Sequence, residues 1–118
     1  MKTLKSGVIY HGGTLPVPSR LQKGALELEG GALRLLARAK DPRFDLDLRI
    51  PLDRIERAAA EERKYYSSVG YFLVIDFQGE DGAPARVELE IRSFIRRGRT
   101  QALCRHWAEV LSDVRSTP

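Results

Sequence analysis

Apolar and polar residues alternate through much of the chain after residue 24. In "GALELEGGALRLLARA", Leu26 and Leu28 alternate with glutamates, the pair Gly30 and Gly31 follows, and the alternation resumes over 32–38. Such alternation indicates strands with one buried face, and two glycines between two such runs indicate a tight hairpin. This stretch therefore predicts two antiparallel strands joined by a two-residue turn.

Three further segments show the same alternation or are rich in strand-forming residues. They are 44–50, with Phe44, Leu46, Leu48 and Ile50 on one side; 71–77, "YFLVIDF"; and 85–92, with Val87, Leu89 and Ile91 on one side. One-sided alternation is typical of an antiparallel sheet that has one buried and one solvated face. We therefore expect one antiparallel sheet to form most of the domain.

Near the carboxyl end the apolar period becomes that of a helix. Spacings of one, three and four residues place an apolar stripe on Leu103, Trp107, Val110, Leu111 and Val114. The stripe predicts an amphipathic helix of about four turns over about 99–114, with Thr100 as a candidate N-cap. The predicted structural core of this helix, with Trp107 as the plug of the sheet, is Leu103, Trp107, Val110 and Leu111.

The segment "PLDRIERAAAEERKYY" at 51–66 is ambiguous. Pro51 suits the first position of a helix, and the run from Ala58 to Glu62 consists of good helix formers. Completion of the sheet, however, requires a strand here. Residue pattern alone leaves 56–66 open between strand and helix.

Four features occur in a fixed order: the hairpin "KGALELEGGALRLLARA", the hexamer "IPLDRI" at 50–55, two further strands and a terminal amphipathic helix. In this order the chain resembles the bacterial pleckstrin-homology-like (PH-like) and GRAM domains over about residues 7–114. The resemblance implies a mainly β (α+β) fold, with a bent antiparallel sheet or partly open barrel of about seven strands over 7–92, capped by a C-terminal helix. It also makes 56–66 a strand, and a sheet with an inserted helix is the alternative.

Length and composition fit a single domain over 1–118. The chain is 42% hydrophobic and 31% charged, and it is long enough to bury one core without disulfide bonds or bound metal ions. A single cysteine, Cys104, excludes an internal disulfide framework. We find no apolar run of about 18 residues for a membrane helix, nor one of about 7 to 15 for a secretory signal. The sequence therefore predicts a cytoplasmic protein with no transmembrane segment.

Basic charge is concentrated near the start of the predicted helix. The net charge is +4, yet the stretch 91–108 holds five arginines and no acidic residue. Arg96, Arg97 and Arg99 lie around the start of the predicted helix and are candidate anion-binding residues. Few aromatic residues accompany them, which argues against a nucleic-acid partner. About 1 kcal/mol for each basic residue near an anionic bilayer gives only weak membrane binding.

Lipid-binding PH-like domains carry a lysine near the first strand and a basic-x-Arg pair on the second. Here Lys23 precedes the hairpin and the nearest pair is Arg38 and Lys40, in reversed order, while the glycine turn is too short to hold a headgroup. This departure argues against phosphoinositide binding.

Residues capable of catalysis are present, but none forms a catalytic set. Cys104 and His106 are two apart on a helix and so point to different sides, and His11-Gly12-Gly13 is interpreted as a glycine turn. Cross-strand charge ladders are the expected role of three carboxylate pairs facing four arginines: Glu27 and Glu29, Asp45 and Asp47, Glu88 and Glu90, with Arg34, Arg38, Arg49 and Arg86. There is no phosphate loop, dinucleotide fingerprint or metal-binding Cys/His spacing. We expect no enzyme activity, no cofactor and no metal.

The adjacent tyrosines Tyr65 and Tyr66 would lie at a loop tip if 56–66 is a strand. Tyrosine is enriched where proteins meet partners, although one of the two can instead be buried at the strand end. The sequence predicts a non-enzymatic interaction module that docks a protein partner or self-assembles. The alternative is a weak peripheral binder of anionic ligands, either phospholipid headgroups or nucleic acid, through the loop from Arg96 to Arg99.

Overall fold

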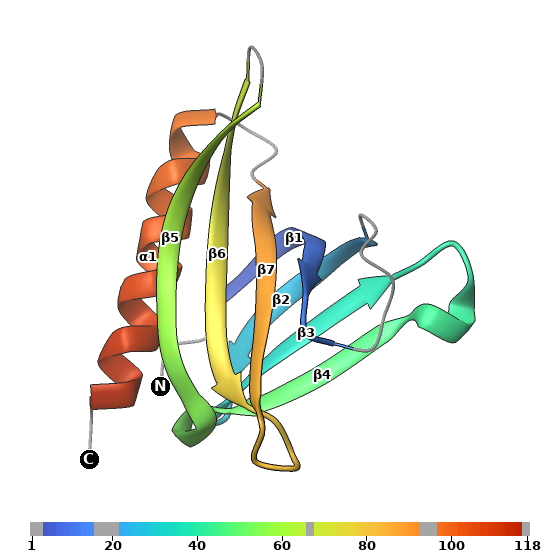
Figure 1. Ribbon diagram of the computed structural model, residues 1–118. Helices are drawn as coiled ribbons and strands as arrows, with labels where there is room; N and C mark the ends of the chain where they lie inside the picture. The colour runs from blue at the N-terminus through green and yellow to red at the C-terminus, as the bar shows by residue number, and fades with distance from the viewer. Residues whose placement is uncertain (1–3, 16–21, 66–67, 93–96, 117–118) are drawn as a thin grey trace.

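A computed structural model describes residues 4–15, 22–65, 68–92 and 97–116. These residues form seven strands, one α-helix and two short 3-10 helices (Figure 1): β1 (Leu4–Gly13), β2 (Gln22–Glu29), β3 (Ala32–Arg38), η1 (Pro42–Phe44), β4 (Leu46–Pro51), η2 (Leu52–Arg54), β5 (Ile55–Tyr65), β6 (Ser68–Gln78), β7 (Pro84–Arg92) and α1 (Arg97–Ser116). All neighbouring strands pair antiparallel, in the order β4-β3-β2-β1-β7-β6-β5. The predicted architecture of seven antiparallel strands with a C-terminal helix is confirmed.

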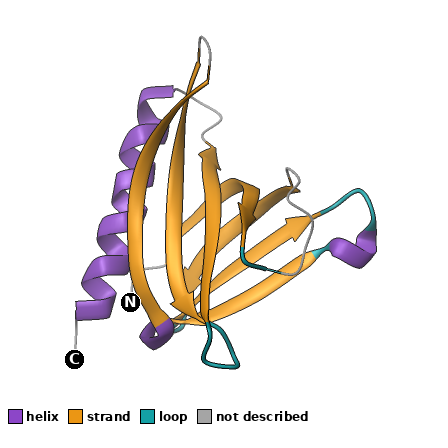
Figure 2. Ribbon diagram, in the orientation of Figure 1, coloured by secondary structure: helices purple, strands orange, loops and turns teal. Residues whose placement is uncertain are grey.

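The sheet is bent, with β1 shared between its two halves. Figures 1 and 2 show β5, β6 and β7 upright beside α1, while β2, β3 and β4 run across them. Inward-facing apolar side chains of both halves form one core, to which α1 contributes Cys104, Trp107 and Leu111. The alternation in the sequence produces this core because successive side chains of a strand point to opposite faces.

Trp107 joins the helix to the middle of the sheet. Its side chain is 0% exposed, and its indole Nε1 donates a hydrogen bond to the Ser6 hydroxyl of β1 at 2.8 Å. Ser6 is a buried polar residue, so this hydrogen bond satisfies a group that would otherwise be costly to bury. Leu111 is also buried, and Leu103 and Val110 are half-buried and pack against the same core.

Three glycines shape the predicted hairpin of β2 and β3. Gly30 and Gly31 have φ angles of +61° and +80°, as a two-residue turn of the type I′ class requires. Within β2, a Cβ atom on Gly24 would lie 1.8 Å from the carbonyl oxygen of Leu36 on β3. Only glycine allows the two backbones to approach this closely.

The ambiguous segment is a strand throughout its described part. β5 covers Ile55–Tyr65 and pairs with β6, for example Ala58 with Ile75 and Ala60 with Leu73. Alanine and glutamate favour a helix by only tenths of a kcal/mol per residue, which sheet pairing and packing override. The prediction of a strand is confirmed for 56–65, and residue 66 lies outside the described residues.

Two boundary predictions are wrong. Phe44 belongs to η1 rather than to the inward face of a strand, and it is 39% exposed. The cause is local: Pro42 fixes a helical φ, and the Asp41 side chain accepts a hydrogen bond from the Arg43 amide. The helix begins at Arg97, so Thr100 lies inside it and is not the N-cap.

Gly98 lies inside the helix, one residue after its start, because the free-energy cost of a glycine there is small. One glycine in a helix costs only about 1 kcal/mol, and the arginines on either side of it are good helix formers. The packing of the helix on the sheet can absorb that cost. The residues directly before Arg97 lie outside the described part of the chain.

The segment His11-Gly12-Gly13 is part of β1, so the predicted glycine turn is wrong. The pairing of β1 with β7 shifts register between Tyr10 and Gly12, which marks a β-bulge at His11. A Cβ atom on Gly13, whose φ is +148°, would lie 2.1 Å from the carbonyl oxygen of Arg86. The glycine therefore permits close strand contact rather than a chain reversal.

Candidate functional site

An open groove of about 560 Å³ runs between β5 and α1. Three alanines of β5 form one wall and four small or acidic residues of α1 form the other: Ala58, Ala59 and Ala60, and Ala108, Glu109, Ser112 and Asp113. Four of these seven side chains are single methyl groups. The groove exists because small side chains line both the strand and the helix.

One side of the groove is the edge of the sheet. β5 is the last strand in the sheet order, and within the described residues it pairs with β6 and with no other strand. The backbone amides and carbonyls on the outer side of an edge strand are a template for another strand. The sulfur of Cys104 in α1 accepts a hydrogen bond from the backbone at Glu61, which places the helix beside the strand.

The side chains of β5 alternate between the two faces of the sheet. Ala58 and Ala60 lie opposite the core residues Ile75 and Leu73 of β6, on the side of the sheet that α1 covers. Ala59 lies opposite Val74, on the outer face. A segment that entered the groove would therefore meet methyl groups on both faces.

Charged residues flank the alanines at both ends. Arg57 precedes them and Glu61 follows them, both exposed and both on the outer face of the sheet. Arg57 makes no ion pair with any residue that the structure describes. Glu61 is held at 2.9 Å by Arg63, while its side chain remains 48% exposed. The uncharged centre of the edge is thus bounded by a cation on one end and an anion on the other.

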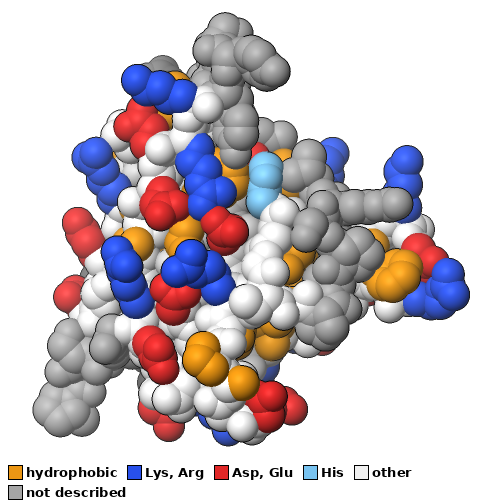
Figure 3. Space-filling model, viewed as in Figure 1, with side chains coloured by type: hydrophobic (Ala, Val, Ile, Leu, Met, Phe, Trp, Pro, Cys, Tyr) orange, Lys and Arg blue, Asp and Glu red, His pale blue; other side chains and the backbone are white. Residues whose placement is uncertain are grey.

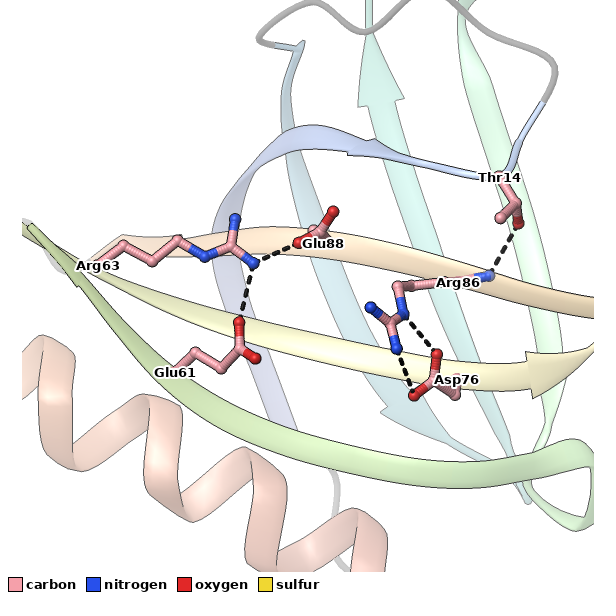
Figure 4. Close-up of polar contacts among 6 residues, drawn as sticks. All are labelled: Thr14, Glu61, Arg63, Asp76, Arg86 and Glu88. Atoms are coloured by element: carbon pink, nitrogen blue, oxygen red, sulfur yellow. Dashed lines mark hydrogen bonds and ion pairs between the residues drawn. The ribbon is translucent and has the colours of Figure 1, made fainter. Parts of the chain in front are cut away.

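An ion-pair network centred on Arg63 covers the outer face of β5, β6 and β7. Figure 3 shows basic and acidic side chains interspersed on this face, and Figure 4 shows Arg63 reaching across β6 toward Glu88 of β7. Arg63 also bonds Glu61, and its guanidinium lies 4.4 Å from the ring centroid of Phe72. The hydrogen bonds that Arg63 donates to Glu88 and Glu61 raise the pKa of Arg63, so the guanidinium remains charged. Phe72 is consequently 0% exposed although it lies on the outer face.

Two smaller contacts extend the network. His11 packs edge-on against the Phe72 ring, with centroids 4.6 Å apart, and its Nε2 lies 2.9 Å from Glu90 Oε1. Arg86 donates to Asp76 on β6 at 2.6 Å, and its backbone amide donates to the Thr14 hydroxyl at 2.8 Å (Figure 4). These contacts fix β1 to β7 and β7 to β6, and they hold polar side chains that the sequence presented as candidates for catalysis.

The predicted charge ladders are present in part: the predicted pair of Arg34 with Asp47 forms, whereas Glu27 and Glu88 have other partners. Glu27 pairs with Lys5 at 3.0 Å, and Arg34 binds Asp47 through two hydrogen bonds that lower the pKa of that carboxyl. Glu88 pairs with Arg63 rather than with one of the four predicted arginines. That error arose because strand order, which sequence alternation does not specify, decides which charges meet.

Cys104 lacks the environment of a nucleophile. It is 1% exposed, and burial raises the pKa of its thiol to about 11. The thiol therefore stays protonated near neutral pH, where only a thiolate would react. His106 is exposed on another side of the helix. Among the described residues, no group of three or more His, Cys, Asp or Glu side chains could hold a metal ion.

The other predicted contact residues fall partly outside the described part. Tyr66 and Arg96 lie outside it. Tyr65 is the last residue of β5, and the backbones of Arg97 and Arg99 lie in the first turn of α1. Their roles as partner or anion contacts remain predictions. In the residues that are described, no helix is long and apolar enough to cross a membrane.

Sequence reasoning missed the groove. The run "AAA" was interpreted as a helix-forming signal, whereas in an edge strand it leaves the backbone accessible. The usable signal was the combination of three alanines in a strand with Ala108 and Ser112 in the helix that follows. No known protein-family model matches the chain, and no curated protein matches it.

Proposed function

We propose that the chain is a non-enzymatic interaction module that docks a protein segment along the free edge of β5, under the flank of α1. The observation that carries this function is the groove in which an unpaired strand edge is lined by alanines. Strand addition is a recurring mode of peptide recognition, in which main-chain hydrogen bonds supply affinity and side-chain contacts supply specificity. The groove offers both elements.

The alanines matter because an added strand must approach closely. Neighbouring strands lie about 4.8 Å apart, and bulky side chains on the adjacent helix would block that approach. Here the helix presents Ala108 and Ser112 to the groove. Glu109 adds negative charge to the same wall, which favours a docking segment with basic or neutral side chains on that face.

A PH-like assignment is part of the same proposal. Its support is the order of elements, seven antiparallel strands followed by one C-terminal helix that packs on β5, β6 and β7. Docking at β5 does not depend on that assignment, since it follows from the edge and the groove alone. The protonated Cys104 thiol and the ion-paired side chains of the outer face support a role in binding rather than catalysis.

Site-specific photo-crosslinking tests this function. A benzophenone amino acid at Glu109, on the helical wall, should give a discrete adduct in cells that express the chain naturally. The same probe at Glu80, an exposed residue of the β6–β7 loop, is the matched control. The blocking variant Ala60→Lys adds a charged side chain to the exposed part of the edge and should abolish the Glu109 adduct without lowering the melting temperature.

Three results would contradict docking at β5. The first is the absence of any adduct from Glu109. The second is the appearance of the same adducts from the Glu80 probe, and the third is an adduct from Glu109 that persists in the Ala60→Lys variant. Any of these results would move the interaction surface away from this groove.

A further inference from the structure

The residues of β5 that border the groove have a pattern that is complementary to itself. From Arg57 to Glu61 the strand reads cation, three alanines, anion. Reversing the strand direction and placing the copy alongside puts the cation of one strand opposite the anion of the other. A sequence of this kind suits pairing with an identical strand that runs antiparallel.

We infer that the segment that occupies the groove is β5 of a second copy of this chain, paired antiparallel about a two-fold axis at Ala59. This pairing rests on the proposed function and names its partner. Under such an axis Ala59 lies opposite Ala59 of the second copy, and Ala58 lies opposite Ala60. Arg57 then faces Glu61 of the second copy, and the symmetry produces this contact twice.

The geometry of the strand agrees with this register. Residues directly opposite in an antiparallel pair share a face, and Arg57 and Glu61 are both on the outer face of the sheet. Their Cβ atoms would lie about 4.5–5.5 Å apart across the new pair, which is within reach of an ion pair. Arg57 has no ion-pair partner among the described residues of its own chain, so the second copy supplies one.

Neighbouring symmetric registers are less favourable. An axis at Ala60 would place Arg57 opposite Arg63 of the second copy, and cross-strand like charges are destabilising. An axis at Ala58 would place Ile55 opposite Glu61 and leave Arg57 opposite an alanine. Of these three axes, only the one at Ala59 places Arg57 opposite an acidic residue.

The ends of the pairing are set by the chain itself. The β5–β6 register shifts between Ile55 and Arg57, which marks Glu56 as a bulged residue. A bulge bends the strand and interrupts regular pairing. The regular edge therefore starts at Arg57, where the palindromic segment starts, and the small residues Ala108 and Ser112 leave room for the second strand beside each helix.

Sedimentation velocity on the full chain, over about 1 µM to 1 mM, measures the self-association. The parent chain of 13.3 kDa should form a dimer whose population rises with concentration. Arg57→Glu and Glu61→Arg each convert two attractive contacts per dimer into two repulsive ones, and each should raise the dissociation constant on the order of tenfold. The double variant Arg57→Glu/Glu61→Arg restores opposite charges across the axis and should restore the parent dissociation constant.

Controls separate association from folding. Arg49→Glu changes an exposed arginine on β4, at the other edge of the sheet, and should leave the dimer unchanged. Glu61→Gln removes the charge without placing a second cation near Arg63, so it should weaken the dimer less than Glu61→Arg does. Circular dichroism confirms that each variant is folded.

The outcomes distinguish this pairing from the proposed function. A chain that stays monomeric throughout overturns the pairing, as does a dimer that the charge reversals do not weaken or the double variant does not restore. If the Glu109 probe then still gives an adduct with a different protein, and Ala60→Lys abolishes it, docking at β5 stands with another occupant. If that adduct is also absent, both the pairing and the proposed function are wrong.

Discussion

Replacement of Trp107 by alanine tests how the helix closes the sheet. The side chain is fully buried, and large-to-small changes at buried aromatic residues cost about 3–5 kcal/mol. The variant also leaves the buried Ser6 hydroxyl without its donor at 2.8 Å, which adds about 1 kcal/mol. Against a total stability of about 5–15 kcal/mol for a domain of this size, the loss should leave the chain marginally folded.

The assay benefits from Trp107 being the single tryptophan of the chain. Urea unfolding of the parent can be followed by its fluorescence, and unfolding of the Trp107→Ala variant by far-ultraviolet circular dichroism. Unfolding free energies within about 1 kcal/mol of each other would refute the central position of this residue. The parent should also show blue-shifted emission that moves to the red on unfolding.

A double-mutant cycle isolates the hydrogen bond from the packing. Trp107→Phe removes the indole N–H and keeps an aromatic ring, while Ser6→Ala removes the acceptor. The coupling free energy between the two changes should be about 0.5–1.5 kcal/mol. A coupling near zero would mean that the two side chains do not form this hydrogen bond in solution.

Three further predictions concern the sheet and its buried thiol. Gly24→Ala should lower the free energy of unfolding in urea by at least about 1–3 kcal/mol, because its methyl group would lie 1.8 Å from a carbonyl oxygen of β3. Gly79→Ala should cost less, because the nearest contact of its methyl group is a flexible side chain. Arg63→Ala should destabilise the chain by about 1–2 kcal/mol because it uncovers the Phe72 ring. Arg34→Ala breaks a solvent-exposed ion pair and should cost under about 1 kcal/mol. Equal losses would contradict the conclusion that Arg63 covers Phe72. Burial raises the pKa of the Cys104 thiol to about 11 in the folded chain, from about 8.5 when the chain is unfolded. The contribution of the protonated thiol to the free energy of unfolding is therefore present at neutral pH and is lost as the pH rises toward 11. The melting temperature of the parent should therefore fall more steeply across that interval than that of Cys104→Ala, and parallel curves would show that the thiol is not buried.

The strands with one-sided alternation were predictable because period two is a direct consequence of strand geometry. β2, β3 and β7 follow the pattern closely, with Leu33, Leu35, Val87 and Leu89 buried as expected. The helix was predictable from its stripe, but its start was not, because Gly98 and the arginines around it carry no strong signal of a boundary. At β1 the sequence "HGG" was misinterpreted, since a glycine needed for close strand contact looks like one needed for a turn.

β5 shows why the site was harder to predict than the fold. Its composition favours a helix, and the strand was predicted only from the resemblance carried by "IPLDRI" and from the need to complete the sheet. The groove depends on which strand lies at the edge and on which helical residues lie beside it, and neither is encoded locally. Arg63 illustrates the same limit: its partner Glu88 is on β7 and its covered ring, Phe72, is on β6. Charge partners of this kind are decided by strand order.

The two edges of the sheet differ in a way that bears on assembly. β4, at one edge, is six residues long, ends in Pro51 and carries the outward charges of Asp47 and Arg49, all of which make it a poor template for another strand. β5, at the other edge, is eleven residues long with an uncharged centre. Because only one edge is suited to pairing, the two-fold contact that we infer would use the available edge of both copies at once and could not propagate. A closed dimer rather than an open-ended fibre is the expected product, and the charges at the ends of the alanine run restrict the edge to a partner with the complementary spacing.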